Sequence, residues 1–346
     1  MKKIIFTFIF CLASLSIFAT NYKVLFLGNS YTEVNNLPQL VYTVSLSTGD
    51  TITFTSNTPG GCTLQQHLTA SASLIQQGGW DYVVLQEQSQ LPSFPIDQFM
   101  SQSYPFAQQL CQMVSQYNPQ AQVVFYMTWG RKNGDAENAA SFPILGTYEG
   151  MDSLLHARYM MMAEDNDAIV SPVGALWHYI RHNNPEIELY NADGSHPSLE
   201  GSYAAACSFY TIFFQKDPTL IQTDAGVEPA IAQIIRQAAR HVVFDSLSTW
   251  MFTNDDSVAV NVQEPLQVSI FPNPTVQYMH VKLSRPDVIF YNISIYNKQG
   301  VLIQQYLNIE DSDHLLDLST LDDGLYMIVI ETADHEKIVK KFIKSL

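Results

Sequence analysis

The sequence is short of charge, and of positive charge most of all. Only 14% of the 346 residues are charged, whereas about 25% is usual for a soluble domain. The 17 lysines and arginines are outnumbered by 33 aspartates and glutamates, which gives a formal net charge of −16. Binding of nucleic acid requires a basic surface, so this composition argues against a nucleic-acid partner. Hydrophobic residues, at 47%, exclude wholesale disorder, and the length suggests about two domains.

Cysteine is also scarce, and no pair has the spacing of a metal site. The four cysteines are Cys11, Cys62, Cys111 and Cys207. No C-x-x-C motif occurs, so we expect neither a zinc site nor a redox dithiol. His178 and His182 have the i, i+4 spacing of ligands on one helix face, but no third ligand accompanies them. The sequence therefore predicts no metal and no cofactor.

Only the N-terminus carries a hydrophobic run of note. Lys2 and Lys3 precede an apolar stretch over 4–19 that ends in the small residue Ala19. A positive start, a short apolar middle and a small final residue are typical of a secretory signal peptide, which we predict over 1–19. No later stretch reaches about 18 uninterrupted apolar residues, so we expect no integral membrane span in the mature chain.

Between residues 22 and 250, short apolar runs alternate with longer helical patterns. We predict strands over 23–27, 51–55, 80–85, 122–127 and 169–173, and helices over 37–46, 99–117, 151–166 and 198–214. Near-continuous apolar strands that alternate with helices indicate an α/β domain with a parallel sheet covered on both faces. Reactive groups in such sheets gather beyond the carboxyl ends of the strands. The loops that follow 23–27, 80–85 and 122–127 should therefore be neighbours.

The pattern changes after the first domain. A polar segment at 254–257 lies within a predicted linker over 251–267. Strand-length runs separated by turn residues follow it, for example the turns at 272–274, 297–300 and 322–324. Short strands at regular spacing predict a small antiparallel β-sandwich over 268–346.

Two short motifs carry residues suited to acyl transfer. Gly28-Asn29-Ser30 follows the first predicted strand, where a glycine allows a sharp turn and a serine can be exposed. Asp193 and His196 lie in D-G-S-H-P, close enough to face one site from a single loop. A serine nucleophile needs a base, and the base needs an orienting carboxylate. Taken singly, each motif is better explained without catalysis, by a helix-capping serine in the first case and by a turn aspartate with a surface histidine in the second.

Together, G-N-S-Y near the N-terminus and D-x-x-H-P near the domain end resemble the SGNH (GDSL-type) hydrolase family. The resemblance covers most of 22–250 and implies a three-layer, flavodoxin-like fold. It implies Ser30 as the nucleophile, His196 as the general base and acid, and Asp193 as the orienting carboxylate. The oxyanion donors of the family would correspond to the N–H groups of Ser30 and of Gly61, with Gly60 as the alternative glycine.

The third oxyanion donor departs from the family pattern. An asparagine is usual after the third strand, whereas this chain has Gln86-Glu87-Gln88. We expect Gln86 to replace the asparagine, with Gln88 as the alternative, because side chains alternate along an extended strand end. A polar loop that merely ends the strand is the competing interpretation. Glu87 is a candidate substrate contact or an ion-paired loop residue, and Trp129 a candidate pocket wall or a core residue.

The C-terminal part resembles the sorting domain of type IX secretion. The motifs appear in order: F-P-N-P at 271–274, a glycine turn at 300, G-x-Y at 324–326 and a basic end at 340–344. The resemblance implies type IX secretion machinery as a partner and export through the periplasm to the cell surface or the medium. A generic accessory sandwich that binds sugar is the alternative, but the aromatic residues alternate along strands as core residues do.

The combined prediction is a secreted serine ester hydrolase that removes small acyl groups, such as acetyl, from carbohydrate. The expected substrate is a small acyl ester or an acylated glycan. A non-catalytic glycan-binding protein of the cell surface and an acyltransferase on the same fold are the alternatives, since hydrolysis and transfer share one acyl-enzyme.

Overall fold

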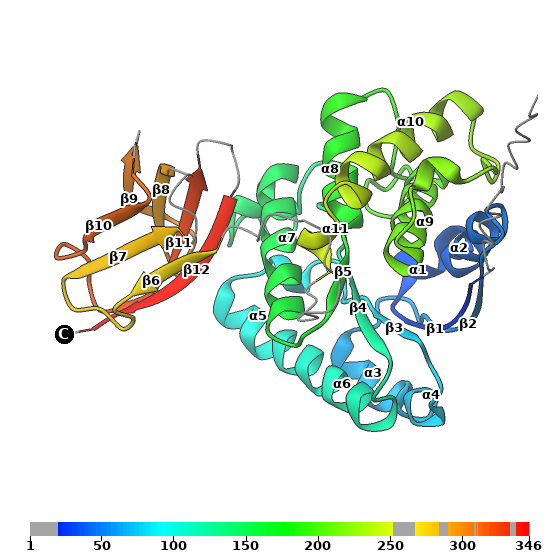
Figure 1. Cartoon of the computed structure of the whole chain (residues 1–346), viewed down its shortest axis with the longest axis horizontal. Coiled ribbons are helices and arrows are strands. Elements are labelled where there is room, and N and C mark those ends of the chain that lie inside the picture. The colour runs from blue at the N-terminus through cyan, green and yellow to red at the C-terminus, as the bar shows by residue number, and fades with distance from the viewer. Residues whose placement is uncertain are drawn as a thin grey trace, which may run out of the picture. The chain divides into compact units, whose positions relative to one another are not determined.

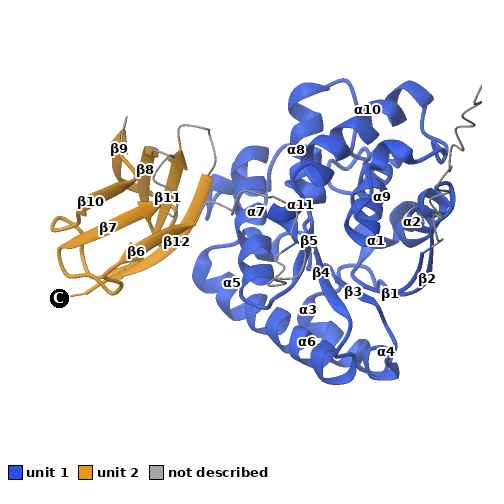
Figure 2. Ribbon diagram, viewed as in Figure 1, with its two compact units in different colours: residues 1–253 blue, residues 254–346 orange. Residues whose placement is uncertain are grey.

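The computed structural model describes residues 20–251, 267–283, 290–307, 309, 311–332 and 337–345. The chain forms two compact units, residues 1–253 and 254–346 (Figure 2). The predicted signal peptide over 1–19 and most of the predicted linker lie outside the described residues. Within those residues, no helix is both long and apolar enough to cross a bilayer.

The first unit is built on a five-stranded sheet in the order β2-β1-β3-β4-β5. The strands are β1 (Asn21–Leu27), β2 (Thr51–Asn57), β3 (Tyr82–Leu85), β4 (Gln122–Tyr126) and β5 (Ile169–Ser171). Every neighbouring pair is parallel. Consecutive residues of β1 and β3 are buried, because helices cover both faces of the sheet. The predicted α/β fold with a parallel sheet is confirmed.

Helices form the two outer layers (Figure 1). On one face lie α2 (Leu37–Leu46) and α9 (Leu199–Phe214), with α10 (Pro229–Ala239) packed against α9. On the other lie α3 (Leu64–Ala70), α4 (Ala72–Gln77), α6 (Tyr104–Tyr117) and α7 (Tyr148–Glu164). The remaining helices are α1 (Ser30–Glu33), α5 (Ile96–Gln102), α8 (Val173–Asn183) and α11 (Leu247–Trp250). Phe26 of β1 meets Phe209 and Phe213 of α9 edge-on, which ties this strand to a helix that is buried along most of its length.

The helix predicted over 99–117 is two helices. Helix α5 ends at Gln102, and α6 begins at Tyr104, with Ser103 in a non-helical conformation between them. Pro105 explains the break, because it has no N–H to donate to the preceding turn and its ring would clash with the carbonyl of Ser101. The apolar periodicity continues across the break, so the pattern alone predicted a single helix.

The second unit consists of two antiparallel sheets, β10-β7-β6 and β12-β11-β8-β9. Its strands are β6 (Val268–Phe271), β7 (Tyr278–Leu283), β8 (Phe290–Asn297), β9 (Leu302–Leu307), β10 (Asp313–Asp317), β11 (Gly324–Thr332) and β12 (Lys337–Lys344). Alternate residues such as Met279, Val281 and Leu283 enter one core shared by both sheets. The predicted antiparallel architecture is confirmed.

Candidate active site

Ser30 is held at the carboxyl end of β1 by a turn that requires glycine. A Cβ atom at Gly28 would lie 2.5 Å from the Thr32 hydroxyl oxygen and 2.7 Å from the side-chain oxygen of Gln86. No residue larger than glycine fits there without displacing one of them. The buried His67 donates from Nε2 to the Gly28 carbonyl at 2.9 Å and fixes the same turn from the side of α3. Ser30 then begins the short helix α1.

Asn29 joins this turn to the glycine-rich loop after β2. Its Oδ1 accepts from the N–H of Tyr31 at 3.1 Å and so caps α1, while its Nδ2 donates to the Cys62 carbonyl at 3.0 Å. Gly61, next to Cys62, has φ +68° and is exposed. Among the hydrogen bonds of the described residues, none uses the N–H of Ser30 or of Gly61. Both N–H groups predicted as oxyanion donors are therefore available.

The structure brings together Ser30, His196 and Asp193. The Ser30 hydroxyl lies 2.9 Å from His196 Nε2, and His196 Nδ1 lies 2.5 Å from Asp193 Oδ2. The other carboxylate oxygen, Oδ1, accepts from the N–H groups of Ser195 at 2.9 Å and His196 at 3.0 Å. With the Nδ1 proton donated to the carboxylate, Nε2 is left as the free base that faces the serine.

The outer side of this loop is open to water. The side chains of Asp193 and His196 are 48% and 34% exposed, and a cavity of about 320 Å³ adjoins Asp193 and Gly194. Burial alone would raise the pKa of the Asp193 carboxyl, but hydrogen bonds from Ser195 and His196 hold that pKa below its ordinary value. The carboxylate is therefore ionised at neutral pH and able to orient the imidazole.

A stack of three aromatic rings contacts the loop over 193–196, which we call the histidine loop. Tyr31 stacks on Trp129 at 4.7 Å between ring centroids, and Trp129 stacks on Trp177 at 3.7 Å. The Tyr31 hydroxyl bonds to Ser195 Oγ at 2.7 Å, and the Trp129 indole N–H donates to the Ser195 carbonyl at 3.0 Å. Trp129 is fully buried, so its predicted place in a pocket wall is wrong. It is a core residue that holds the loop of His196.

Gln86 is not placed as an oxyanion donor. It is fully buried, and its side-chain oxygen accepts from the Asn29 N–H at 3.0 Å and the Thr32 hydroxyl at 2.9 Å. Its amide nitrogen donates to the Glu87 carbonyl at 2.6 Å. These contacts hold the Gln86 amide against Asn29, Thr32 and the backbone of Glu87. The expectation that Gln86 is the third oxyanion donor is therefore corrected. The residue positions Ser30 through Asn29.

Gln88 fits the donor role better. It is partly exposed, and its Oε1 is oriented by the N–H groups of Gln90 at 2.8 Å and Leu91 at 3.2 Å. Its Nε2 gives one proton to Gln90 Oε1 at 3.2 Å, and an amide nitrogen has a second proton to donate. Of the two glutamines, Gln88 remains the candidate.

Glu87 lies inside the protein and not in the substrate site. Its side chain is fully buried, which makes the predicted substrate contact wrong. Oε1 accepts from the N–H of Leu64 at 3.0 Å and of Gln88 at 2.7 Å, and Oε2 accepts from the Ser103 hydroxyl at 2.7 Å. Burial raises the pKa of Glu87 to about 7, although these hydrogen bonds lower it. The carboxyl connects the loop after β3 to the start of α3.

Among the described residues, no group of three metal-ligating side chains occurs. His178 pairs instead with Asp152, whose Oδ2 lies 3.0 Å from Nδ1, and this hydrogen bond raises the pKa of His178. Cys62, Cys111 and Cys207 are free and buried. The expectation that no metal or cofactor is needed stays a prediction.

The strand order and the helices on both faces define the first unit as a flavodoxin-like α/β fold, with Ser30 just beyond the carboxyl end of β1. Comparison with known proteins identifies the C-terminal segment more directly. Residues 269–345 match the family described as Secretion system C-terminal sorting domain. A domain of this family indicates export by type IX secretion to the cell surface or extracellular space, as predicted.

Solved structures support the fold of the first unit. A DUF4886 family protein from Bacteroides uniformis superposes with a TM-score of 0.56 at 17% identity, over 64% of this chain and 94% of that one. A proposed SGNH hydrolase from Slackia heliotrinireducens gives 0.46 at 26% identity, over 55% and 97%. Axe2, an acetylxylan esterase from Geobacillus stearothermophilus, gives 0.42 at 14%, over 55% and 93%. Only the first score exceeds 0.5, so the fold assignment rests on it and on the strand order.

A curated relative matches a smaller part. Ulvan lyase NLR42 of Nonlabens ulvanivorans is 26% identical over 99 residues, which are 29% of this chain. The match spans 18% of that lyase, less than a fifth of its length. The lyase activity of that protein is therefore not transferred to this chain.

Sequence reasoning missed several residues around the site. Asn29, Tyr31 and Ser195 lie within the two quoted motifs, but their contacts depend on the approach of distant loops. Arg131 is also near, because its charge acts on the Tyr31 hydroxyl. Its only sequence signal is its position just beyond β4, where active-site loops of parallel sheets lie.

Proposed function

We propose that the first unit is a serine ester hydrolase that removes small acyl groups, such as acetyl, from carbohydrate. The observation that carries the proposal is the chain of contacts from Ser30 to His196 at 2.9 Å and from His196 to Asp193 at 2.5 Å. A partly exposed hydroxyl, an imidazole nitrogen that faces it and an ionised carboxylate in this order are the parts of a nucleophilic serine.

The reaction is acyl transfer in two steps. His196 Nε2 takes the proton of the Ser30 hydroxyl as Oγ attacks the ester carbonyl carbon. The N–H groups of Ser30 and Gly61, with the amide of Gln88, stabilise the resulting oxyanion. His196 returns the proton to the leaving alcohol oxygen, and an acyl-enzyme remains. Water then gives a proton to His196 and attacks the acyl carbon, and His196 protonates Ser30 Oγ as the carboxylic acid leaves.

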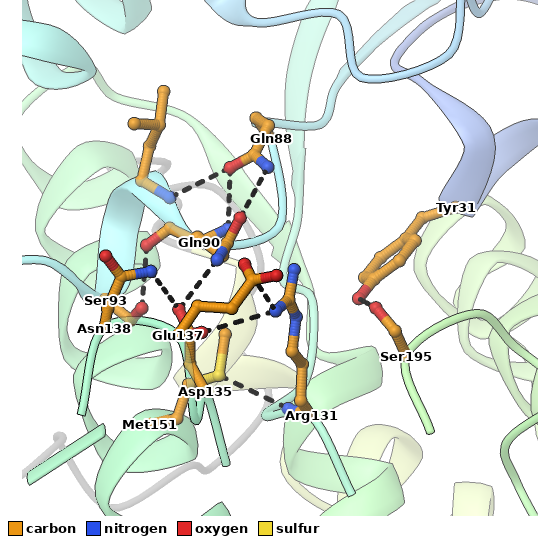
Figure 3. A network of polar contacts seen from close by, with 11 residues as sticks. Tyr31, Gln88, Gln90, Ser93, Arg131, Asp135, Glu137, Asn138, Met151 and Ser195 are labelled. Atoms are coloured by element: carbon orange, nitrogen blue, oxygen red, sulfur yellow. Dashed lines mark hydrogen bonds and ion pairs between the residues drawn. The ribbon is translucent and has the colours of Figure 1, made fainter. Parts of the chain in front are cut away.

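The surroundings of the serine favour a short acyl group on a polar alcohol. Polar side chains lie on the side of Tyr31 and Ser195 that Figure 3 shows, and they include Gln88, Gln90 and Arg131. A long acyl chain gains free energy only where it is removed from water by apolar surface. Export to the cell surface or medium, indicated by the sorting domain, places the enzyme where glycans are abundant.

Turnover of 4-nitrophenyl acetate and of acetylated xylan by the full chain tests the proposal. We expect Ser30→Ala and His196→Ala each to lower kcat by about a thousandfold or more. Gln88→Ala should lower kcat by about 10²–10³, whereas Gln88→Asn keeps the amide and should lose less. Equal, near-background rates for wild type and both mutants, with no labelling of Ser30 by a fluorophosphonate, would favour a non-catalytic glycan-binding protein.

A further inference from the structure

The loop after β4 is fixed beside the histidine loop through its backbone. Gly130 donates its N–H to Asp152 at 3.1 Å and accepts from the Tyr190 hydroxyl at 2.6 Å through its carbonyl. Lys132 donates its N–H to the Gly194 carbonyl at 2.8 Å, and its carbonyl accepts from Arg181 at 3.3 Å. Arg131 lies between these two residues, and its own N–H points at the Met151 sulfur at 3.4 Å. The position of Arg131 in the site therefore does not depend on its side chain.

Within the described residues, the guanidinium of Arg131 makes its polar contacts through Nη1 alone. Nη1 lies 3.4 Å from Asp135 and 3.9 Å from Glu137. Asp135 is fully buried and also accepts from Gln90 at 2.7 Å and Asn138 at 2.8 Å, so its place is set independently of the arginine. Figure 3 shows this network, which continues from Gln90 to Gln88.

The other edge of the same guanidinium has no partner among the described residues. Nε is buried without an acceptor, and no hydrogen bond involves Nη2. A buried N–H without an acceptor costs about 1–3 kcal/mol, so such a group in a site calls for a ligand or an ordered water. The side chain is 24% exposed, and because Nε itself is buried, a ligand would approach this edge from the Nη2 side.

This edge belongs to the active site. In Figure 3 the Nη1 corner faces Asp135 and Glu137, and the rest of the guanidinium faces the side on which Tyr31 and Ser195 lie. The charge of Arg131 is close enough to lower the pKa of the Tyr31 hydroxyl, against the larger effect of burial. Tyr31 bonds to Ser195, the neighbour of His196, and follows Ser30 in the chain.

We propose that the Nε–Nη2 edge of Arg131 binds two adjacent oxygen atoms on the glycan part of the substrate. The guanidinium edge presents two parallel N–H groups, which match a carboxylate or a pair of neighbouring oxygens. A uronate carboxylate and the vicinal hydroxyls of a neutral sugar supply the same chemistry. The inference rests on the proposed function for the identity of the ligand, since it places the alcohol half of the ester beside the β4 loop.

The acidic neighbours do not block this edge. Asp135 neutralises part of the charge but contacts only Nη1. Glu137 is 81% exposed and 3.9 Å away, and an exposed ion pair of this kind contributes about 0–1 kcal/mol. An incoming ligand can therefore reach the guanidinium without breaking a strong contact.

Binding to the full chain with Ser30→Ala tests the proposal without turnover. The probes are xylo-oligosaccharides, which offer vicinal hydroxyls, and oligogalacturonates, which offer carboxylates, titrated by calorimetry. We expect one of them to bind, and Arg131→Ala to weaken that binding by about tenfold or more. Arg131→Lys keeps the charge but not the two-pronged edge, so it should restore only part of the affinity. The class of probe that responds identifies the source of the oxygens.

Lys132→Ala is the matched control. It removes the same charge from the next residue, whose Nζ pairs with Glu188 and takes no part in the network. Equal loss in both variants, no loss in Arg131→Ala, or no binding of either probe to the parent would overturn the proposal. Turnover of 4-nitrophenyl acetate by the chain with Ser30 intact tests the proposed function by itself. A loss of binding with that turnover preserved therefore counts against the role of Arg131 alone.

Discussion

Replacing Glu87 by glutamine should change how the stability of the first unit depends on pH. The side chain is fully buried and accepts three hydrogen bonds, from Leu64, Gln88 and Ser103. Glutamine has nearly the same shape. Its oxygen can accept from both N–H groups, and the Ser103 hydroxyl can turn to accept from its amide nitrogen. The substitution therefore removes the ionisation and keeps the packing.

The size and sign of the effect follow from the pKa of Glu87, which burial raises from an ordinary 4.5 to about 7. In the folded chain the carboxyl keeps its proton to higher pH than in the unfolded chain. Glu87 therefore adds most to stability below about pH 4.5, and this contribution is lost as the pH rises to about 7. The difference corresponds to about 3 kcal/mol, because one pKa unit is worth 1.36 kcal/mol.

Urea unfolding of the full chain, followed by tryptophan fluorescence, measures this effect. All four tryptophans, Trp80, Trp129, Trp177 and Trp250, lie in the first unit, so the signal reports that unit alone. Between about pH 5.5 and pH 8, the free energy of unfolding of wild type should fall by about 2 kcal/mol relative to Glu87→Gln. This range stays above the sequence pI of about 4.8, where solubility is lowest.

The matched control is Glu137→Gln, which removes the same formal charge from a side chain that is 81% exposed. Its stability should follow that of wild type across the range. Parallel curves for wild type and Glu87→Gln would refute the reasoning, because they would mean that Glu87 titrates alike in the folded and unfolded chains.

Two further predictions concern the proposed catalytic residues and the aromatic stack beside them. Asp193→Asn should lower kcat for 4-nitrophenyl acetate by about 10⁴ with little change in the melting temperature, because the amide no longer fixes the imidazole tautomer; a loss below tenfold would contradict the assigned role. Trp129→Ala should lower the free energy of unfolding by about 3–5 kcal/mol, because it opens a cavity between Tyr31 and Trp177. Trp129→Phe, which keeps a ring in the stack, should lose less, and equal losses in urea unfolding would show that stacking is unimportant.

The sequence predicted the residues whose signal is local. Ser30 follows an apolar strand and a glycine, and Asp193 and His196 share one loop. Such signals survive folding because they depend on a strand end and a short turn. The pairing of Ser30 with His196 had no local signal, and the resemblance to a known family supplied it.

Burial is what the sequence could not settle. Gln86, Glu87 and Trp129 all follow strands at the edge where active sites form, and polar or aromatic side chains there suggest contact with substrate. The structure turns all three inward. Gln86 bonds to the turn after β1, Glu87 accepts from Leu64, Gln88 and Ser103, and Trp129 lies in the aromatic stack. Arg131 was missed for the opposite reason, because an arginine in a loop is usually an ordinary surface residue.

The 166 residues between Ser30 and His196 also govern when this site can exist during folding. His196 precedes α9, and α9 packs its aromatic residues against Phe26 of β1, the strand that ends beside Ser30. The two halves of the site therefore meet only through contacts of high sequence separation, which form late because long loops must close first. A chain interrupted before His196 has the serine and no base, and one interrupted before α9 has both residues but lacks the helix that packs against β1. Recovery of the proposed activity after refolding therefore measures the fraction of chains in which α9 is packed against the sheet, and a partly folded chain lacks the assembled site.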